Sequence, residues 1–110
     1  MALIHQFENN FAISNRSDIY FALLNGSLAK DKASFYEQIN IILRMPDYFG
    51  NNLDALNDAL HDLCWIDNQR IFLFIVNSND LLLDMPEYKN QFNSLLKEVD
   101  NENFEVFICS

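Results

Sequence analysis

Three short apolar runs constrain the fold of this chain more than any other feature. Residues 19–24, 71–76 and 104–109 are rich in β-branched and aromatic side chains, and polar residues bound each run. Runs of this length and composition are typical of strands buried on both faces. Helical segments separate the runs, and strands joined through helices pair in parallel. The pattern therefore predicts an α/β fold with a three-stranded parallel sheet.

Helices are expected between these strands. One spans residues 32–44 after an Asp31 cap, and it ends before Pro46 because the residue that precedes a proline disfavours helical geometry. A short turn of helix is expected over residues 80–83, and a longer helix over residues 86–99 begins with a proline. With the helix described next, these segments predict about four helices.

The clearest amphipathic pattern covers residues 53–63, with Asn52 as the expected cap. At about 100° per residue, four leucines fall on one arc of this helix and three acids on the opposite arc. No lysine or arginine occurs between Met45 and Gln69. Because like charges four residues apart destabilise a helix by roughly 0.2–0.5 kcal/mol per pair, the acidic arc suggests a basic partner. The leucines are Leu53, Leu56, Leu60 and Leu63, and the acids are Asp54, Asp58 and Asp62.

Two alternatives to a basic partner stay open for the acidic arc. A solvated helix face accounts well for Asp54 near the helix N-terminus and poorly for Asp62 near the C-terminal end of the helix dipole. A metal site is the second alternative, since Asp58, His61 and Asp62 are close in sequence, although no second ligand cluster completes a shell.

The loop at residues 46–50 places two aromatic residues directly before this helix. One aromatic of such a pair usually packs into the core, and Phe49 is the expected one. Tyr48 is then left near the surface, where it can anchor an interface because it contributes area at little cost in rotamer entropy.

Composition narrows the function classes. The net charge of −9 repels nucleic acid and anionic membranes and favours encounter with cationic proteins, although acidity also serves plain solubility. With only two glycines and no nucleophile elbow, the chain lacks the motifs of phosphate-binding or acyl-transfer enzymes, so we expect neither catalysis nor a cofactor. The two cysteines, Cys64 and Cys109, are too few for a disulfide framework or a zinc site. We expect them to be reduced thiols that pack like small apolar residues. Without a signal peptide or an apolar stretch of about 18–20 residues, a cytoplasmic protein is expected.

Residues 45–60, MPDYFGNNLDALNDAL, resemble the hallmark segment of the barstar family, whose members are intracellular inhibitors of barnase-type ribonucleases. The family pattern is a Leu-Pro-acid-aromatic-aromatic-Gly turn, then Asn-Leu-Asp-Ala-Leu and an acid one turn later. The resemblance covers residues 18–110 and leaves residues 1–17 as an N-terminal extension with a possible extra edge strand. It implies a barstar-like fold, in which a three-stranded parallel sheet packs against about four helices.

The resemblance also implies roles for individual residues. Asp58 matches the family's principal acid, which takes the place of a substrate phosphate among the arginine and lysine residues of the enzyme. Asp54 matches a second acid that pairs with another basic group, and Tyr48 matches the aromatic that packs against the catalytic histidine. Acids of the last helix also take part in the family, and Glu98 or Glu102 matches them.

Some positions depart from the family pattern. Asn57 stands where the family has a tryptophan, and residues 61–63 replace a Thr-Gly-Trp stretch, with Trp65 two positions further on. These departures point to a barnase-like ribonuclease or ribonuclease toxin domain other than barnase as the 1:1 partner of an immunity protein or antitoxin. The alternative is an interaction module that keeps the fold and has no ribonuclease target. The expected partner-binding residues are Tyr48, Asn52, Asp54, Asn57, Asp58, His61, Asp62, Glu98 and Glu102.

Overall fold

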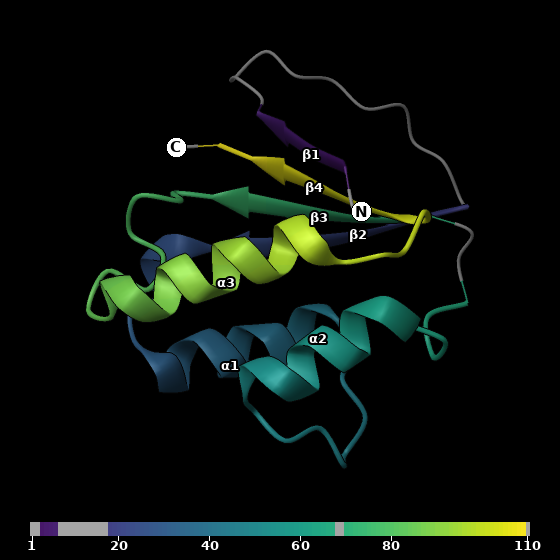
Figure 1. Ribbon diagram of the computed structural model, residues 1–110, viewed down its shortest axis with the longest axis horizontal. Helices are drawn as coiled ribbons and strands as arrows, with labels where there is room; N and C mark the ends of the chain where they lie inside the picture. The colour runs from purple at the N-terminus through teal and green to yellow at the C-terminus, as the bar shows by residue number, and fades with distance from the viewer. Residues whose placement is uncertain (1–2, 7–17, 68–69, 110) are drawn as a thin grey trace.

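A parallel four-stranded sheet forms one layer of the molecule, and the three α-helices of the described residues form the other (Figure 1). The structure is a computed structural model, which describes residues 3–6, 18–67 and 70–109, with the backbone alone for residues 3–6. The strand order is β1-β4-β3-β2. The strands are β1 (Leu3–Gln6), β2 (Ile19–Asn25), β3 (Arg70–Val76) and β4 (Phe104–Ile108).

The three predicted strands and their parallel pairing are confirmed. The fourth strand, β1, lies within the segment interpreted as an N-terminal extension, and it pairs with β4 at the edge of the sheet, with Leu3 opposite Glu105. Residues 7–17, the rest of that extension, lie outside the described residues.

The helices are α1 (Lys32–Ile42), α2 (Leu53–Asp62) and α3 (Pro86–Glu98), and a short 3-10 turn, η1 (Gly26–Leu28), follows β2. Asp31 caps α1, since its Oδ1 accepts a hydrogen bond from the Ser34 N–H at 2.8 Å. Gly26 is required where it stands, because a Cβ atom there would lie 2.2 Å from the Asn77 carbonyl oxygen. Within the described part of the chain, no helix is both long and apolar enough to cross a membrane.

The expected number of about four helices is wrong, because residues 80–83 form turns instead of a helix. Leu82 adopts a left-handed backbone conformation, with φ of 51°, which interrupts helical geometry. Its N–H donates to the Ala29 carbonyl at 2.8 Å, and the Asp84 N–H donates to the Lys30 carbonyl at 3.0 Å. Hydrogen bonds to the residues after η1 therefore replace the bonds that a helix would make.

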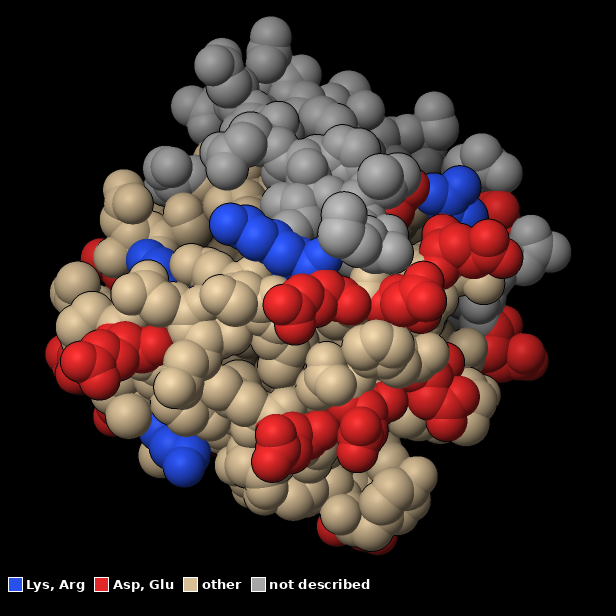
Figure 2. Space-filling model, in the orientation of Figure 1, with Lys and Arg blue, Asp and Glu red and all other residues tan. Residues whose placement is uncertain are grey.

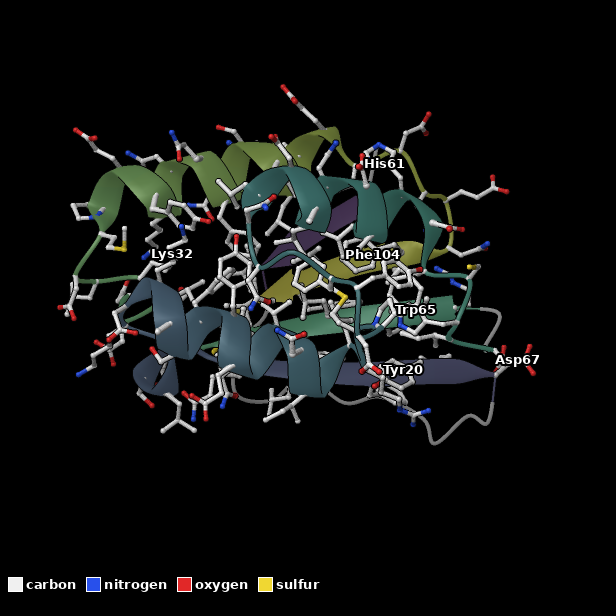
Figure 3. The ribbon with its side chains drawn as sticks, turned by 90° about the horizontal axis from the view of Figure 1, so that it is seen from below. Tyr20, Lys32, His61, Trp65, Asp67 and Phe104 are labelled. Carbon is white, nitrogen blue, oxygen red and sulfur yellow. The ribbon has the colours of Figure 1, made fainter. Side chains whose placement is uncertain are left out.

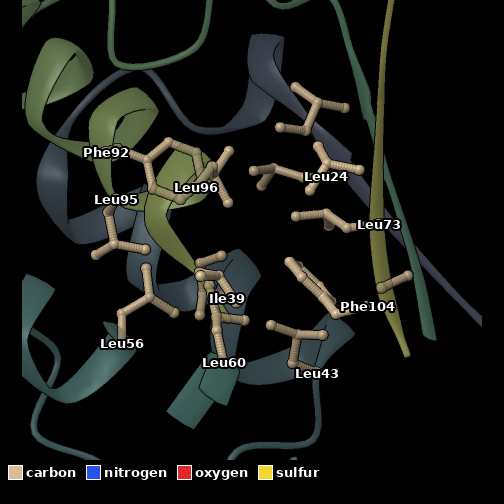
Figure 4. Close-up of a cluster of buried hydrophobic side chains, with 14 of the residues drawn as sticks. Leu24, Ile39, Leu43, Leu56, Leu60, Leu73, Phe92, Leu95, Leu96 and Phe104 are labelled. Carbon is tan, nitrogen blue, oxygen red and sulfur yellow. The ribbon is translucent and has the colours of Figure 1, made fainter. Parts of the chain in front are cut away.

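The main core lies between the sheet and the helices (Figure 4). Alternate residues of the strands, such as Leu24 and Leu73, face this layer and are almost fully buried. Each helix contributes an apolar face to the same cluster, with Ile39 from α1, Leu60 from α2 and Phe92 from α3. Close packing here holds α2 against the sheet and leaves its other side to solvent.

The expectation that the strands are buried on both faces is wrong for β2, because all three helices pack on one face of the sheet. On the opposite face, Phe21 and Leu23 are 43% and 55% exposed. Aromatic rings from three strands pack together there; Phe74 and Phe107 stack with their centroids 4.8 Å apart, and Phe21 lies 5.9 Å from Phe74. Ring packing within the sheet thus accounts for part of the apolar character of these runs.

Candidate partner-binding surface

Helix α2 begins and ends as its sequence predicts. The Asn52 side-chain oxygen accepts from the Ala55 N–H at 2.8 Å, which caps the first turn. Leu63 ends the helix in a left-handed conformation with φ of 50°. Leu56, Leu60 and Leu63 are buried, whereas Leu53 is half-buried. The leucine arc is confirmed, and it anchors the helix in a fixed orientation.

The acidic arc of α2 lies on the surface. Asp54, Asp58 and Asp62 are all exposed. Figure 2 shows many acidic side chains gathered on the face of the molecule that carries α2 and the end of α3. The backbone N–H groups of the first helical turn favour the charge of Asp54, whereas nothing comparable favours Asp62 at the last turn. Rigid packing below and like charges above make this face suited to a cationic partner.

A hollow of about 240 Å³ lies beside α2 and is called here the aromatic hollow. Tyr48 borders it and is 85% exposed. Asp58 and Asp62 border it from α2, and Trp65 also lines it. The Trp65 ring N–H donates to the Leu43 carbonyl at 2.8 Å, which holds that indole against the end of α1. Two carboxylates therefore share one opening with three aromatic residues, Tyr48, Phe49 and Trp65.

A second hollow, the α2–α3 groove, has a volume of about 430 Å³. Asp54 and Asn57 border it from α2, and Glu98 borders it from the last turn of α3. Of the described residues that border the groove or the aromatic hollow, none is a lysine or arginine. Carboxylates thus line both sides of α2 without a neighbouring cation in either hollow.

Neither hollow is lined by the remaining candidate residues, which are Asn52, His61 and Glu102. Asn52 uses both ends of its amide within the chain, because its Nδ2 also donates to the Gly50 carbonyl at 3.2 Å. Glu102 is exposed but lies in the loop after α3, so it is not an acid of the last helix. Phe49 packs against the core, as predicted, and its ring lies 6.1 Å from that of Tyr36.

His61 makes two hydrogen bonds within the chain. Its Nδ1 lies 2.8 Å from the Asn57 carbonyl oxygen, one helical turn earlier. Its Nε2 accepts from the backbone N–H of Asp100 at 3.1 Å, in the loop between α3 and β4. The metal alternative requires a ring nitrogen that these bonds already occupy. Among the described residues, no three histidine, cysteine or acidic side chains form a group able to hold a metal ion.

Two residues that sequence reasoning did not assign to the surface also shape it. The Asn101 Nδ2 donates to the Leu60 carbonyl at 3.1 Å and joins the loop after α3 to the last turn of α2. A loop asparagine carries no periodic signal, so sequence alone does not point to this contact.

Cys64 is exposed, contrary to the expected apolar packing. It follows Leu63, whose left-handed conformation ends α2, so it does not continue the buried arc of the helix. A hydrogen bond with Asp62 raises the pKa of the Cys64 thiol, with desolvation as a smaller cause.

Comparison with known proteins identifies one family. The family model described as Barstar (barnase inhibitor) matches residues 19–109, which include β2 to β4, all three helices and both hollows. A search of curated proteins finds no match.

Proposed function

Since this chain belongs to the barstar family, we propose that it inhibits a barnase-like ribonuclease by blocking its active site in a 1:1 complex. The family is one of barnase inhibitors, and inhibition is a binding function that needs no chemistry of its own. In the proposed mechanism, α2 and the loop before it imitate substrate phosphates. The protein would act in the cytoplasm as an immunity protein or antitoxin against a ribonuclease toxin domain.

The observation that carries this proposal is the meeting of Tyr48 and Asp58 at the aromatic hollow. A ribonuclease site that binds RNA phosphates presents arginine and lysine side chains. A carboxylate placed among them forms charge-assisted hydrogen bonds, and the exposed Tyr48 ring can pack against a neighbouring side chain of the enzyme. Asp58 and Tyr48 thus supply the charge and the apolar area that such a site lacks.

The α2–α3 groove provides a second set of contacts. Asp54 and Glu98 project from different helices and border the same groove, so a basic side chain entering there meets two carboxylates. Asn57, which stands where the family pattern has a tryptophan, also borders this groove and adds a polar side chain to its lining. We propose that this groove receives a polar or cationic group of the partner and contributes to the choice of target.

Activity measurements with a purified barnase-like ribonuclease test the proposal. Stoichiometric addition of the wild-type protein should abolish RNA cleavage, and a complex of one molecule each should form. Asp58→Ala should weaken the Kd by about 30-fold or more, because truncating one partner of a desolvated charge pair costs about 2–5 kcal/mol, a range to which complexes of this family themselves contribute. Asp54→Ala should cause a smaller loss, since Asp54 borders the α2–α3 groove and not the aromatic hollow where Tyr48 and Asp58 meet.

The matched control is Glu37→Ala, which removes the same charge from an exposed position of α1 that borders neither hollow. It should leave the Kd within about twofold, since a remote surface charge contributes little. If Asp58→Ala and Asp54→Ala both inhibit like the wild type, the assignment of this surface is incorrect.

One observation favours a second candidate function, a barstar-fold interaction module without a ribonuclease target. Asn57 stands where the family pattern has a tryptophan, so the middle of α2 has a more polar surface, and His61 already uses both ring nitrogens within the chain. Under this alternative, affinity purification from the native cells should return a basic protein without nuclease activity. Recovery of a ribonuclease that loses activity in the complex would support inhibition instead.

A further inference from the structure

We infer that His61 is a positioning residue, whose neutral imidazole holds the α3–β4 loop against α2 and so sets the distance between the acids of these two elements. The loop comprises residues 99–103 and begins directly after Glu98. The inference concerns a residue first expected to contact the partner. Its consequence for binding depends on the proposed function, whereas the contact itself does not.

The two hydrogen bonds of His61 determine its protonation state. The Asn57 carbonyl can only accept, so Nδ1 must carry a proton. The Asp100 N–H can only donate, so Nε2 must present its lone pair. Only the neutral tautomer protonated at Nδ1 satisfies both neighbours. The ring is therefore a bridge of defined polarity from α2 to the loop.

A second hydrogen bond supports the same junction. The Asn101 Nδ2 donates to the Leu60 carbonyl at 3.1 Å. That carbonyl belongs to the last turn of α2, where carbonyl groups lack partners within the helix. Adjacent loop residues, Asp100 and Asn101, thus contact adjacent residues of α2. Figure 3 shows His61 at the side of α2 that faces the loop.

This junction links the two sets of acids in the candidate surface. Asp58 and Glu98 come from elements that are otherwise joined mainly through buried side chains below the surface. The last turn of α2 and the first residues after Glu98 meet at His61. A partner that engages both hollows at once needs the acids in a fixed relation, and ordering them before binding lowers the entropy cost of association.

Protonation of His61 breaks the bridge. The imidazolium carries N–H groups on both nitrogens, so the Nε2 donor would face the Asp100 donor. His61 is exposed, so its ring can exchange protons with the solvent. The surrounding carboxylates attract the cation but cannot restore a bond to the Asp100 N–H. Charged residues near the junction in sequence are Asp58 and Asp62 in the second half of α2, Lys97 and Glu98 in the last turn of α3, and Asp100 and Glu102 in the loop.

The free protein supplies the first test, by NMR. At pH 8 the nitrogen shifts of His61 should report a ring protonated at Nδ1. On acidification to pH 5, the Asp100 amide shift should change together with the ring shifts of His61. The protection factor of that amide, its exchange relative to the intrinsic rate at the same pH, should fall. The chain has one other histidine, His5, and His5→Gln should leave these changes unaltered. An Nε2–H tautomer, or an Asp100 amide that does not follow His61, would overturn the inference.

Binding to a barnase-like ribonuclease supplies the second test. The ratio of Kd at pH 5.5 to Kd at pH 8 is measured for the wild type, His61→Gln and His5→Gln with one enzyme, so titration of the enzyme affects all three equally. The ratio should be larger for the wild type than for His61→Gln by about 2–10-fold, the effect of one hydrogen bond. Equal ratios would overturn the inference. If no variant binds while the NMR result holds, the proposed function fails and the bridge remains.

Discussion

Tyr48 and Phe49 are neighbours in the chain with opposite environments. Tyr48 is 85% exposed and borders the aromatic hollow, whereas Phe49 packs on the core. An aromatic side chain that stays exposed to water does not give the folded state the stabilisation that burial of its apolar area would provide. The proposed inhibitor function, in which this surface is covered on binding, would account for the exposure of Tyr48.

Alanine substitutions should separate these two roles. Tyr48→Ala should change the free energy of unfolding by less than about 0.5 kcal/mol but weaken the Kd for the ribonuclease at least about 10-fold. Phe49→Ala should lower the free energy of unfolding by at least about 1 kcal/mol, because it removes packed apolar area. Urea denaturation and binding isotherms measure the two quantities. Equal destabilisation by both substitutions would contradict the division.

The contact between Asp62 and Cys64 gives a prediction about reactivity. Since hydrogen bonding with Asp62 raises the Cys64 pKa, less of this thiol is ionised at a given pH than in a free cysteine. Asp62→Asn should lower the pKa and increase the rate of alkylation by iodoacetamide at pH 8, because the thiolate is the reactive form. Mass spectrometry with Cys109→Ser present isolates the signal. Asp58→Asn is the matched control and should leave the rate unchanged.

At the scale of elements, local signals predict α2 well and fail where distant contacts decide. The Asn52 cap, the leucine arc and the first-turn acid all lie within residues 52–63 and agree with each other, so the helix could be predicted from sequence. Leu82 instead takes a left-handed conformation, and one hydrogen bond from its N–H to the distant Ala29 carbonyl stabilises it. The bond between His61 and Asp100 spans 39 residues and carries no sequence pattern. The bridge that shapes the surface could therefore be found only in the structure.

The cap of α2 affects both stability and binding. Asn52→Ala removes the acceptor for the Ala55 N–H and should lower the free energy of unfolding by about 1 kcal/mol. Asn52→Asp retains an acceptor and should fold nearly as well as the wild type. Since Asp54 lies in the first turn, fraying in Asn52→Ala should also weaken ribonuclease binding more than Asn52→Asp does. Thermal denaturation and Kd measurements test both effects, and equal behaviour of the two variants would contradict the capping role.

At the scale of the whole molecule, hydrophobic patterning could predict three of the four described strands, but neither the pairing of β1 nor the distribution of burial in the sheet. Runs of β-branched and aromatic residues correctly indicate β2, β3 and β4, because strand pairing follows from composition and spacing. The same runs do not reveal that Phe21 is partly exposed on the face opposite the helices. The sequence likewise gives the net charge of −9, whereas the clustering of acidic side chains around α2 depends on the fold.

The excess negative charge should accelerate association with a basic ribonuclease and make it sensitive to salt. The Debye length falls from about 30 Å at 0.01 M salt to about 8 Å at 0.15 M, so long-range attraction is largely screened over that range. The association rate constant should therefore decrease by at least about 10-fold, with a smaller change in the dissociation rate constant. Stopped-flow fluorescence and surface plasmon resonance provide these rates. Asp58→Ala should act differently, mainly raising the dissociation rate, because it removes a contact made at short range in the complex. An association rate that is independent of salt would show that encounter does not use the acidic face of α2.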